Sequence, residues 1–372
     1  MINILVAPTD HYACDLYRCS GPHKKLQEMF PNEFNVIIDY GVNWKLLTYN
    51  NPYDIIYLHN GCYSNGLFEY SLKLKQKSKI ILDIDDYWEL PEGHEAYNRA
   101  IEIKYDELCK SLIRISDYVI TTTEYFKQVL QQYHSNIIVF PNTMDFYPYG
   151  KAPSELIRFG FTGSRSHEHD MEQFKQVTTS LNTTTLSKSQ FMLCGFNKVF
   201  DKKLDPIWSN YEKIITNDYK LTGNITDFNQ VDFVYRRINY KKIDEYLQFY
   251  SFIDVLLAPL LPCEFNNCKS ELKLLEAGIT NTAFIGTNTG PFKVGTSIIN
   301  ADGSINPNGN CILVEPDKDS WVNAIEFVVN HPELINISKR NLTDFVIRNY
   351  NINEWTLKRR DFYFNLIYGQ HA

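Results

Sequence analysis

The sequence predicts an α/β protein of two doubly wound, Rossmann-like domains that face each other across a cleft. Short apolar runs recur at spacings suited to βα units. The pattern starts again near the middle of the chain, after a segment rich in Pro, Gly and Tyr (141–155). A length of 372 residues agrees with two domains, because it is too large for one ordinary core.

The first half contains near-continuous Ile, Val and Leu runs, which are typical of strands buried on both faces of a parallel sheet. These strands are expected at Asn3–Ala7, Asn35–Asp39, Asp54–His59, Lys79–Asp85, Tyr118–Thr123 and Asn136–Phe140. Helical patterns alternate with them, for example over Ala100–Ser116, and this alternation predicts parallel crossover units.

The second half repeats the pattern, with strands expected at Ile157–Gly163, Phe191–Gly195, Val231–Tyr235, Asp254–Leu260, Thr282–Thr287 and Cys311–Pro316. We therefore expect a first domain over residues 1–148, a second over 149–340 and a final helical segment over 341–372. Ligands of open α/β sheets bind beyond the carboxyl ends of the strands, so the site is expected in the cleft.

Composition narrows the class of protein. Hydrophobic residues make up 44% and charged residues 22%, as in globular chains, and no apolar run approaches the ~20 residues of a membrane span. The start of the chain lacks the basic region of a signal peptide, and eight cysteines fit reduced thiols, so we expect a cytoplasmic protein. The richness in Asn, Lys, Ile and Tyr suggests an AT-rich genome, such as that of a bacterium or a virus. The cytoplasm is therefore expected to be that of a bacterium or of a virus-infected host cell. A net charge of −7 disfavours a broad nucleic-acid surface, and the cysteine spacings do not indicate a metal site.

A charged stripe borders the apolar face of a helix predicted over Lys269–Ile279, because Lys269, Lys273 and Glu276 are spaced by four and three. The stripe is either a solvated row of ion pairs or an anion site. A cation in the first turn opposes the helix dipole by ~0.3–1 kcal/mol, and Lys before Glu is the poorer order. An anion bound at the helix N-terminus, with Ser270 beside it, removes the conflict.

A phosphate is the common biological anion, and Glu276 lies about two turns further on, where it can accept hydrogen bonds from a ribose diol. A phosphate and a diol together indicate a nucleotide. A second candidate anion site, Gly163, Ser164 and Arg165, follows the first strand of the second half, although its spacing is not the dinucleotide fingerprint.

Carboxylates crowd at the end of one strand of the first half, at Asp83, Asp85 and Asp86. Clustered carboxylates need cations, donors or raised pKa values. They could orient an acceptor hydroxyl, act as a base or bind Mg²⁺, or they could only cap a helix and form salt bridges. Other side chains expected on this side of the cleft are Asp10, His11, Arg18 and His59, the last of which could equally be a core residue.

Several segments in order resemble the two-domain GT-B glycosyltransferases, in particular the family-4 group of retaining enzymes that use nucleotide-sugars. The resemblance rests on the Pro141-Asn142-x-Met144-Asp145 signature and on the segments "IDEYLQFYSFIDVLLAPLL", "KSELKLLEAGITNTAFIGTNTGP" and "GNCILVEPDKDSWVNAIEFVVNHPEL". It implies that the final helix crosses back onto the first domain.

The resemblance also implies roles. Glu276 would bind the ribose of the donor, and Arg165 with Lys269 or Lys273 would hold the diphosphate. Two positions depart from the group: Cys268 stands where many members carry a Glu eight residues before Glu276, and Asp85 stands where many carry a His.

The sequence thus predicts a hexosyl- or related glycosyltransferase that moves a sugar from a nucleotide-diphosphate sugar to an acceptor hydroxyl, with retention. Asp85, Asp86 and Lys269 are its expected catalytic residues, and no cofactor or metal is expected. The acceptor stays open among glycans, lipid-linked sugars, proteins and modified nucleic acids. The alternatives are a catalytically silent nucleotide-sugar-binding or scaffold protein and a nucleotide-sugar epimerase of the same fold.

Overall fold

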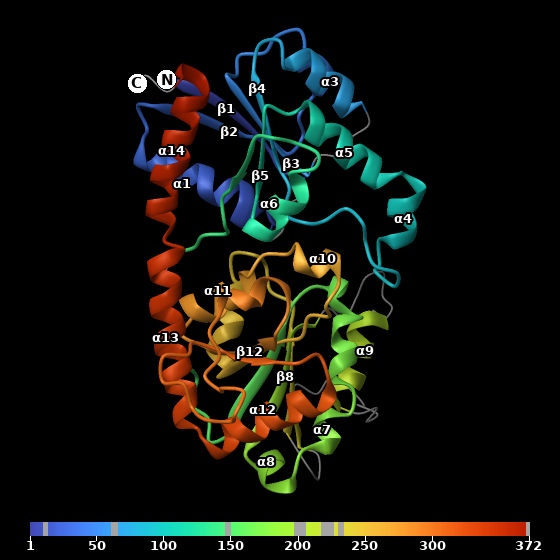
Figure 1. Ribbon diagram of the computed structural model, residues 1–372, viewed down its shortest axis with the longest axis vertical. Coiled ribbons are helices and arrows are strands. Elements are labelled where there is room, and N and C mark those ends of the chain that lie inside the picture. Colours follow the sequence, from blue (N-terminus) through green and yellow to red (C-terminus); the bar gives the residue numbers. More distant parts are fainter. Residues whose placement is uncertain are drawn as a thin grey trace.

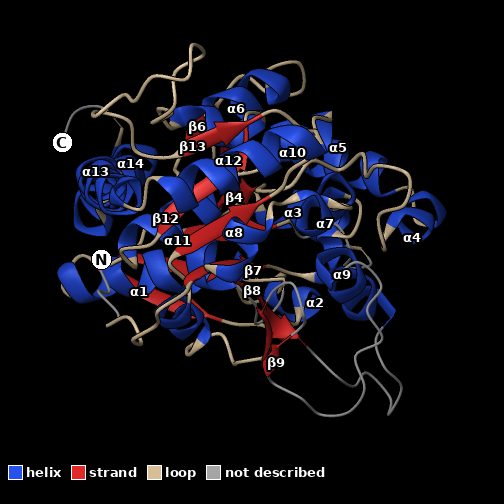
Figure 2. Ribbon diagram, turned by 90° about the horizontal axis from the view of Figure 1, so that it is seen from below, coloured by secondary structure: helices blue, strands red, loops and turns tan. Residues whose placement is uncertain are grey.

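The computed structural model describes residues 1–9, 14–60, 66–145, 150–196, 206–216, 227–229 and 234–369. Two open sheets with their helices follow one another along the longest axis, as Figure 1 shows. Seen from below, the strands form central layers with helices on both sides (Figure 2). The predicted fold class, two doubly wound α/β units, is confirmed.

The first sheet contains six described strands, all parallel, in the order β2-β1-β3-β4-β5-β6. Apolar residues alternate between its two faces: Ile56 and Leu58 pack in one core cluster, and Ile55 and Tyr57 in another. The strands are β1 (Ile2–Ala7), β2 (Phe34–Ile38), β3 (Ile55–His59), β4 (Lys79–Asp83), β5 (Tyr118–Thr121) and β6 (Ile137–Val139).

The second sheet contains seven described strands in the order β13-β12-β11-β7-β8-β10-β9. Six are parallel, and β9, which the sequence did not predict, pairs antiparallel with β10. The strand order reverses between β7 and β11, and this reversal fixes where the carboxyl ends leave room for a ligand. The strands are β7 (Ile157–Thr162), β8 (Ser189–Phe196), β9 (Asp227–Asn229), β10 (Val234–Asn239), β11 (Val255–Ala258), β12 (Ala283–Thr287) and β13 (Ile312–Val314).

Helices cover both sheets, and one segment that the sequence predicts as a single helix forms two helices. The expected helix Ala100–Ser116 is broken at Lys104, which has a left-handed conformation with φ of 53°. The helices of the first unit are η1 (Asp15–Ser20), α1 (Gly21–Met29), α2 (Trp44–Leu47), α3 (Leu67–Leu74), α4 (Tyr97–Glu102), α5 (Tyr105–Ile115) and α6 (Glu124–Leu130). Those of the second are η2 (Arg165–His167), η3 (Asp170–Phe174), α7 (Val177–Ser180), α8 (Thr183–Ser187), α9 (Pro206–Thr216), η4 (Tyr246–Phe252), α10 (Glu264–Asn267), α11 (Leu272–Ile279), η5 (Gly290–Val294) and α12 (Lys318–Asn330).

The C-terminal segment forms two long helices, α13 (Glu333–Asn349) and α14 (Ile352–Tyr368), along one side of the molecule (red in Figure 1). α13 packs on α11 and β12, whereas α14 packs on α1 of the first unit. Asn351 separates them, because its side chain caps the start of α14. His23 and Tyr363 join α1 to α14 through a 2.7 Å hydrogen bond.

None of the described helices combines the length and the apolar character needed to cross a bilayer. In the same part of the chain, no three His, Cys, Asp or Glu side chains gather in a way that could hold a metal ion.

Candidate functional site

A pocket lies at the carboxyl ends of β7 and β11, where the strand order of the second sheet reverses. Its walls are largely apolar and aromatic, and Ser164, His167 and Lys273 add polar groups. At Gly163 in its lining, an added Cβ would meet only His167, at an ordinary 3.7 Å. The protein itself therefore does not require glycine at this position, and the space is open to a ligand. The apolar walls include Phe161, Leu193, Trp208, Leu257 and Phe292.

The predicted helix from Lys269 to Ile279 is wrong at its start. α10 ends at Asn267 and α11 begins at Leu272, so Lys269 lies in the connection and not in a first helical turn. The reason is tertiary: Phe265 and Cys268 pack into the core cluster of the first domain, and the chain then turns into α11. Lys269 thus does not oppose a helix dipole, although Lys273, the second residue of α11, does.

Glu276 lies in a buried cluster, with 1% of its surface exposed. Lys273 Nζ contacts its Oε2 at 2.7 Å, and Tyr250 donates to the same oxygen at 2.6 Å. Tyr17, from the first domain, donates to Oε1 at 3.2 Å. Burial and the Glu276 carboxylate raise the pKa of both tyrosines well above the ordinary value, so their hydroxyls stay protonated as donors. The carboxylate predicted to bind a ribose is therefore engaged by the chain itself.

The ammonium of Lys273 is shared among acceptors. It contacts the hydroxyl of Tyr246, and it lies 3.3 Å from Thr162 Oγ1 at the end of β7. Burial opposes its charge, but Glu276 and Tyr246 outweigh burial and raise the pKa of Lys273. The predicted neighbourhood of Lys273 and Glu276 on one helical face is confirmed, with Lys273 turned toward the pocket lining.

Three other predicted donor residues contact the first domain. Lys269 Nζ lies 3.6 Å from Asp86 Oδ1, and Arg165 Nη1 lies 3.6 Å from Glu95 Oε2. Ser270 Oγ accepts a hydrogen bond of 2.8 Å from the amide of Asn142. These three residues therefore lie at the junction of the two domains, and the partners named here come from the first domain.

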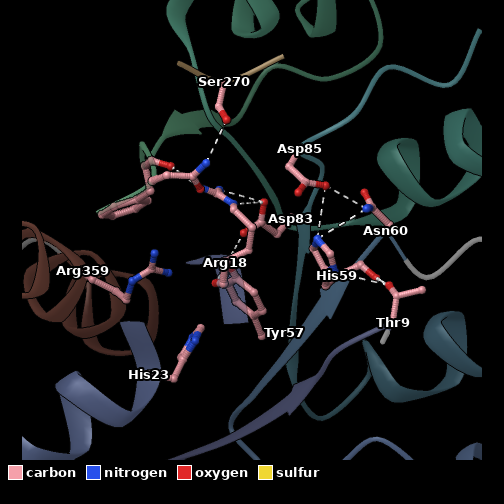
Figure 3. A network of polar contacts seen from close by, with 12 residues as sticks. Thr9, Arg18, His23, Tyr57, His59, Asn60, Asp83, Asp85, Ser270 and Arg359 are labelled. Carbon is pink, nitrogen blue, oxygen red and sulfur yellow. Dashed lines mark hydrogen bonds and ion pairs between the residues drawn. The ribbon is translucent and has the colours of Figure 1, made fainter. Parts of the chain in front are cut away.

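Asp85 is held by two donors at the carboxyl ends of β3 and β4 (Figure 3). His59 Nε2 lies 3.2 Å from Asp85 Oδ1, and the Asn60 amide donates to the same oxygen at 2.8 Å. Burial opposes ionisation of Asp85, but His59 outweighs it and holds the pKa of the carboxyl well below its ordinary value. Asp86, the next residue, points instead toward Lys269 of the second domain.

Arg18, which is expected from the sequence on the acceptor side, is only 1% exposed, and its guanidinium is engaged within the first domain. Its guanidinium forms an ion pair of 2.8 Å with Asp83 and donates to the carbonyl of Phe140 at 2.6 Å. It also donates to Asn142 Oδ1 at 3.3 Å, which links the Arg18–Asp83 pair to Ser270 (Figure 3). Arg18 is thus part of the internal support of the site. The other two loop candidates, Asp10 and His11, lie outside the described residues.

Sequence reasoning missed the tyrosines of the Glu276 cluster. Tyr246 and Tyr250 are spaced by four in η4, a pattern that also fits ordinary core packing. Tyr17 approaches Glu276 from 259 residues away in sequence, and no local pattern signals such a contact.

Two Rossmann-like units, a pocket at the strand reversal of the second sheet and a C-terminal helix on the first unit together define the GT-B fold. No protein-family model and no curated protein sequence matches the chain. Solved structures are similar over nearly the whole length.

Sucrose-phosphate synthase from Thermosynechococcus elongatus is 13% identical, with 98% of both chains covered and a TM-score of 0.68. The catalytic domain of starch synthase IV from Arabidopsis thaliana, bound to ADP and acarbose, is 12% identical, with 98% of this chain and 99% of that chain covered and a TM-score of 0.65. HepE of Anabaena, in complex with UDP and glucose, is 11% identical, with 97% and 98% covered and a TM-score of 0.61. At these identities the similarity shows the fold.

Proposed function

We propose that the protein is a glycosyltransferase that moves a sugar, with retention, from a nucleotide-diphosphate sugar to an acceptor hydroxyl. The observation that carries this proposal is the pocket at the strand reversal, in which apolar walls meet Lys273 beside the buried Glu276. A mostly apolar pocket with a few convergent polar groups is the usual form of a small-molecule site. Similar folds are solved with UDP-glucose or with ADP, which supports a nucleotide-sugar as donor.

The chemistry assigned to the site is electrostatic. The bond between the anomeric carbon and the diphosphate oxygen breaks, and the acceptor oxygen forms its bond on the same face. The hydroxyl proton passes to the departing phosphate. Lys269, Lys273 and Arg165 would offset the charge that develops on the diphosphate, and electrostatic stabilisation of this kind typically lowers barriers by several kcal/mol. Glu276 would accept the ribose hydroxyls once Tyr17 leaves it, and Asp85 and Asp86 would face the acceptor.

A panel of nucleotide-sugars, with and without glycoside acceptors, tests the proposal by nucleotide release and product analysis. Lys269→Ala is expected to slow transfer by about 100-fold, because it removes one stabilising charge from the leaving group. Lys318→Ala removes a partly exposed lysine paired with its neighbour Asp319, so it should leave the rate unchanged and serves as the matched control. Normal turnover of Lys269→Ala would contradict the assignment.

The same panel separates the alternatives. Binding of a nucleotide-sugar without any nucleotide release would favour a silent binding protein. Interconversion of free nucleotide-sugars in the absence of an acceptor would favour an epimerase.

A further inference from the structure

A buried imidazole stands beside the carboxylate that replaces the histidine expected from the resemblance. His59 ends β3 and pairs in register with Asp83 of β4, two residues before Asp85. It is 1% exposed, and its Nε2 faces Asp85 Oδ1 at 3.2 Å. Two adjacent parallel strands therefore place an imidazole and a carboxylate together at the carboxyl ends of the strands, on the side that faces the second domain (Figure 3).

The hydrogen bonds of His59 define its protonation. The Thr9 hydroxyl donates its only proton to the carbonyl oxygen of His59. Toward His59 Nδ1, which lies 3.3 Å away, the same hydroxyl can therefore act only as an acceptor. Nε2 faces the Asp85 carboxylate, which is also an acceptor. The two facing acceptors favour the doubly protonated, charged imidazole, and the Asn60 amide, 3.4 Å from Nε2, lies beside the closer Asp85 carboxylate. Burial disfavours that charge, but Cys19 and Asp85 outweigh burial and raise the pKa of His59 well above its ordinary value.

Asp85 receives both of its bonds on one oxygen. His59 and Asn60 reach Oδ1, whereas within the described part of the chain no hydrogen bond or ion pair reaches Oδ2. The side chain is 10% exposed, so it is fixed by its surroundings and still accessible. An ionised carboxylate with one oxygen anchored and the other open is an acceptor for a single hydroxyl group.

We propose that Asp85 binds a hydroxyl group of the acceptor sugar through Oδ2, and that His59 is the positioning residue that holds it. This inference rests on the proposed function and adds the role of each residue. Asp85 is paired with a cation and stays ionised, so it orients the hydroxyl and does not keep its proton. The proton goes to the departing donor phosphate, as in the transfer step proposed above. Asn60 fixes the same oxygen and completes the support.

The test compares Asp85→Asn, His59→Ala and His59→Gln with the wild type, with p-nitrophenyl glycosides as acceptor probes. Loss of a hydrogen bond to a charged group typically costs about 1.5–3 kcal/mol. We therefore expect Asp85→Asn and His59→Ala to reduce kcat/KM for the acceptor by about 10–100-fold, chiefly through the acceptor KM. The affinity for UDP should stay within about 3-fold, because the residues expected to bind the donor are unchanged. Glutamine can still donate to Oδ1, so His59→Gln should restore most of the activity.

A readout without turnover tests the pair itself. In ¹⁵N-histidine NMR spectra at pH 7, both nitrogens of His59 should be protonated in the wild type, and the ring should become neutral in Asp85→Asn. His331→Gln is the matched control for His59→Gln, since His331 lies in the second domain and its side chain is 42% exposed.

The outcomes are distinguishable. A wild type that neither binds UDP nor releases nucleotide from any donor overturns the proposed function. An active wild type whose Asp85→Asn variant keeps its acceptor KM overturns only this inference, as does a neutral His59 at pH 7. Equal loss of UDP affinity and of acceptor binding in Asp85→Asn would show a structural role and would also overturn it.

Discussion

The two domains neutralise their charges at the cleft in different ways. In the first domain the pairs are internal and buried, and both side chains of the Arg18–Asp83 pair are at most 1% exposed. In the second domain Lys273 is paired internally with the buried Glu276, but Lys269 and Arg165, which are 17% and 36% exposed, lie 3.6 Å from carboxylates of the opposite domain. The internal pairs are preorganised, whereas the cross-domain pairs are weak contacts that an incoming anion can replace.

The largest effect is expected from breaking an internal pair. Asp83→Asn leaves the buried Arg18 guanidinium without its counter-charge, and such losses cost about 3–5 kcal/mol. Urea unfolding should show this decrease in the free energy of unfolding. Glu102→Asn, which breaks the exposed pair with Arg99, should change it by less than about 1 kcal/mol. Equal effects of the two variants would remove the distinction between internal and surface pairs.

The next effect concerns the His59–Asp85 pair and its dependence on pH. Since the pKa of His59 is raised on folding, its contribution is complete below about 6.5 and is lost as pH rises through the folded pKa. Since the pKa of Asp85 is lowered, its contribution is complete above 3.8 and is lost as pH falls.

His59→Ala should therefore lower the free energy of unfolding by about 2 kcal/mol at pH 5.5, and the difference should shrink toward alkaline pH. Urea titrations at a series of pH values measure it. A difference that grows with pH would have the wrong sign for a charged pair.

A smaller effect is expected for the cross-domain pairs. Removing one of their carboxylates should increase the measured quantity, which is here the affinity for UDP. Asp86→Asn and Glu95→Gln remove carboxylates that compete with a diphosphate for Lys269 and Arg165. Each partly exposed pair contributes about 0.2–1 kcal/mol, so the affinity for UDP should rise by up to about 5-fold. Calorimetry checks this, with Glu89→Gln, a carboxylate paired with Lys110 inside the first domain, as control. Weaker UDP binding in both variants would show that these carboxylates support the nucleotide.

The smallest effect is expected for the bond between the Tyr125 hydroxyl and Glu264 Oε2, 2.9 Å long and exposed. Tyr125→Phe should change both stability and UDP affinity by less than about 0.5 kcal/mol. A larger loss would mean that exposed cross-domain contacts hold the domains more firmly than their geometry indicates.

The sequence by itself determined the sheets. Runs such as "NILVA" and "DIIYLH" became β1 and β3, because burial on both faces of a parallel sheet leaves a continuous apolar signature. It also placed Lys273 next to Glu276, since a spacing of three along a helix is a local property. It failed where Lys104 and Cys268 turn the chain, because those breaks depend on what the neighbouring residues pack against.

Tertiary structure alone decided the partners. In the sequence, Arg18 has the pattern of an exposed cation in a loop. In the structure, the order of the strands brings it next to Asp83, 65 residues away, and both side chains are buried. His59 and Asp85 meet because β3 and β4 are adjacent, and Lys269 meets Asp86 because the two domains close on each other. Hydrophobic periodicity records only whether a side chain is covered. Which charged group becomes the partner of a given side chain depends on the order of the strands and on the docking of the domains. A short-range sequence pattern contains information on neither.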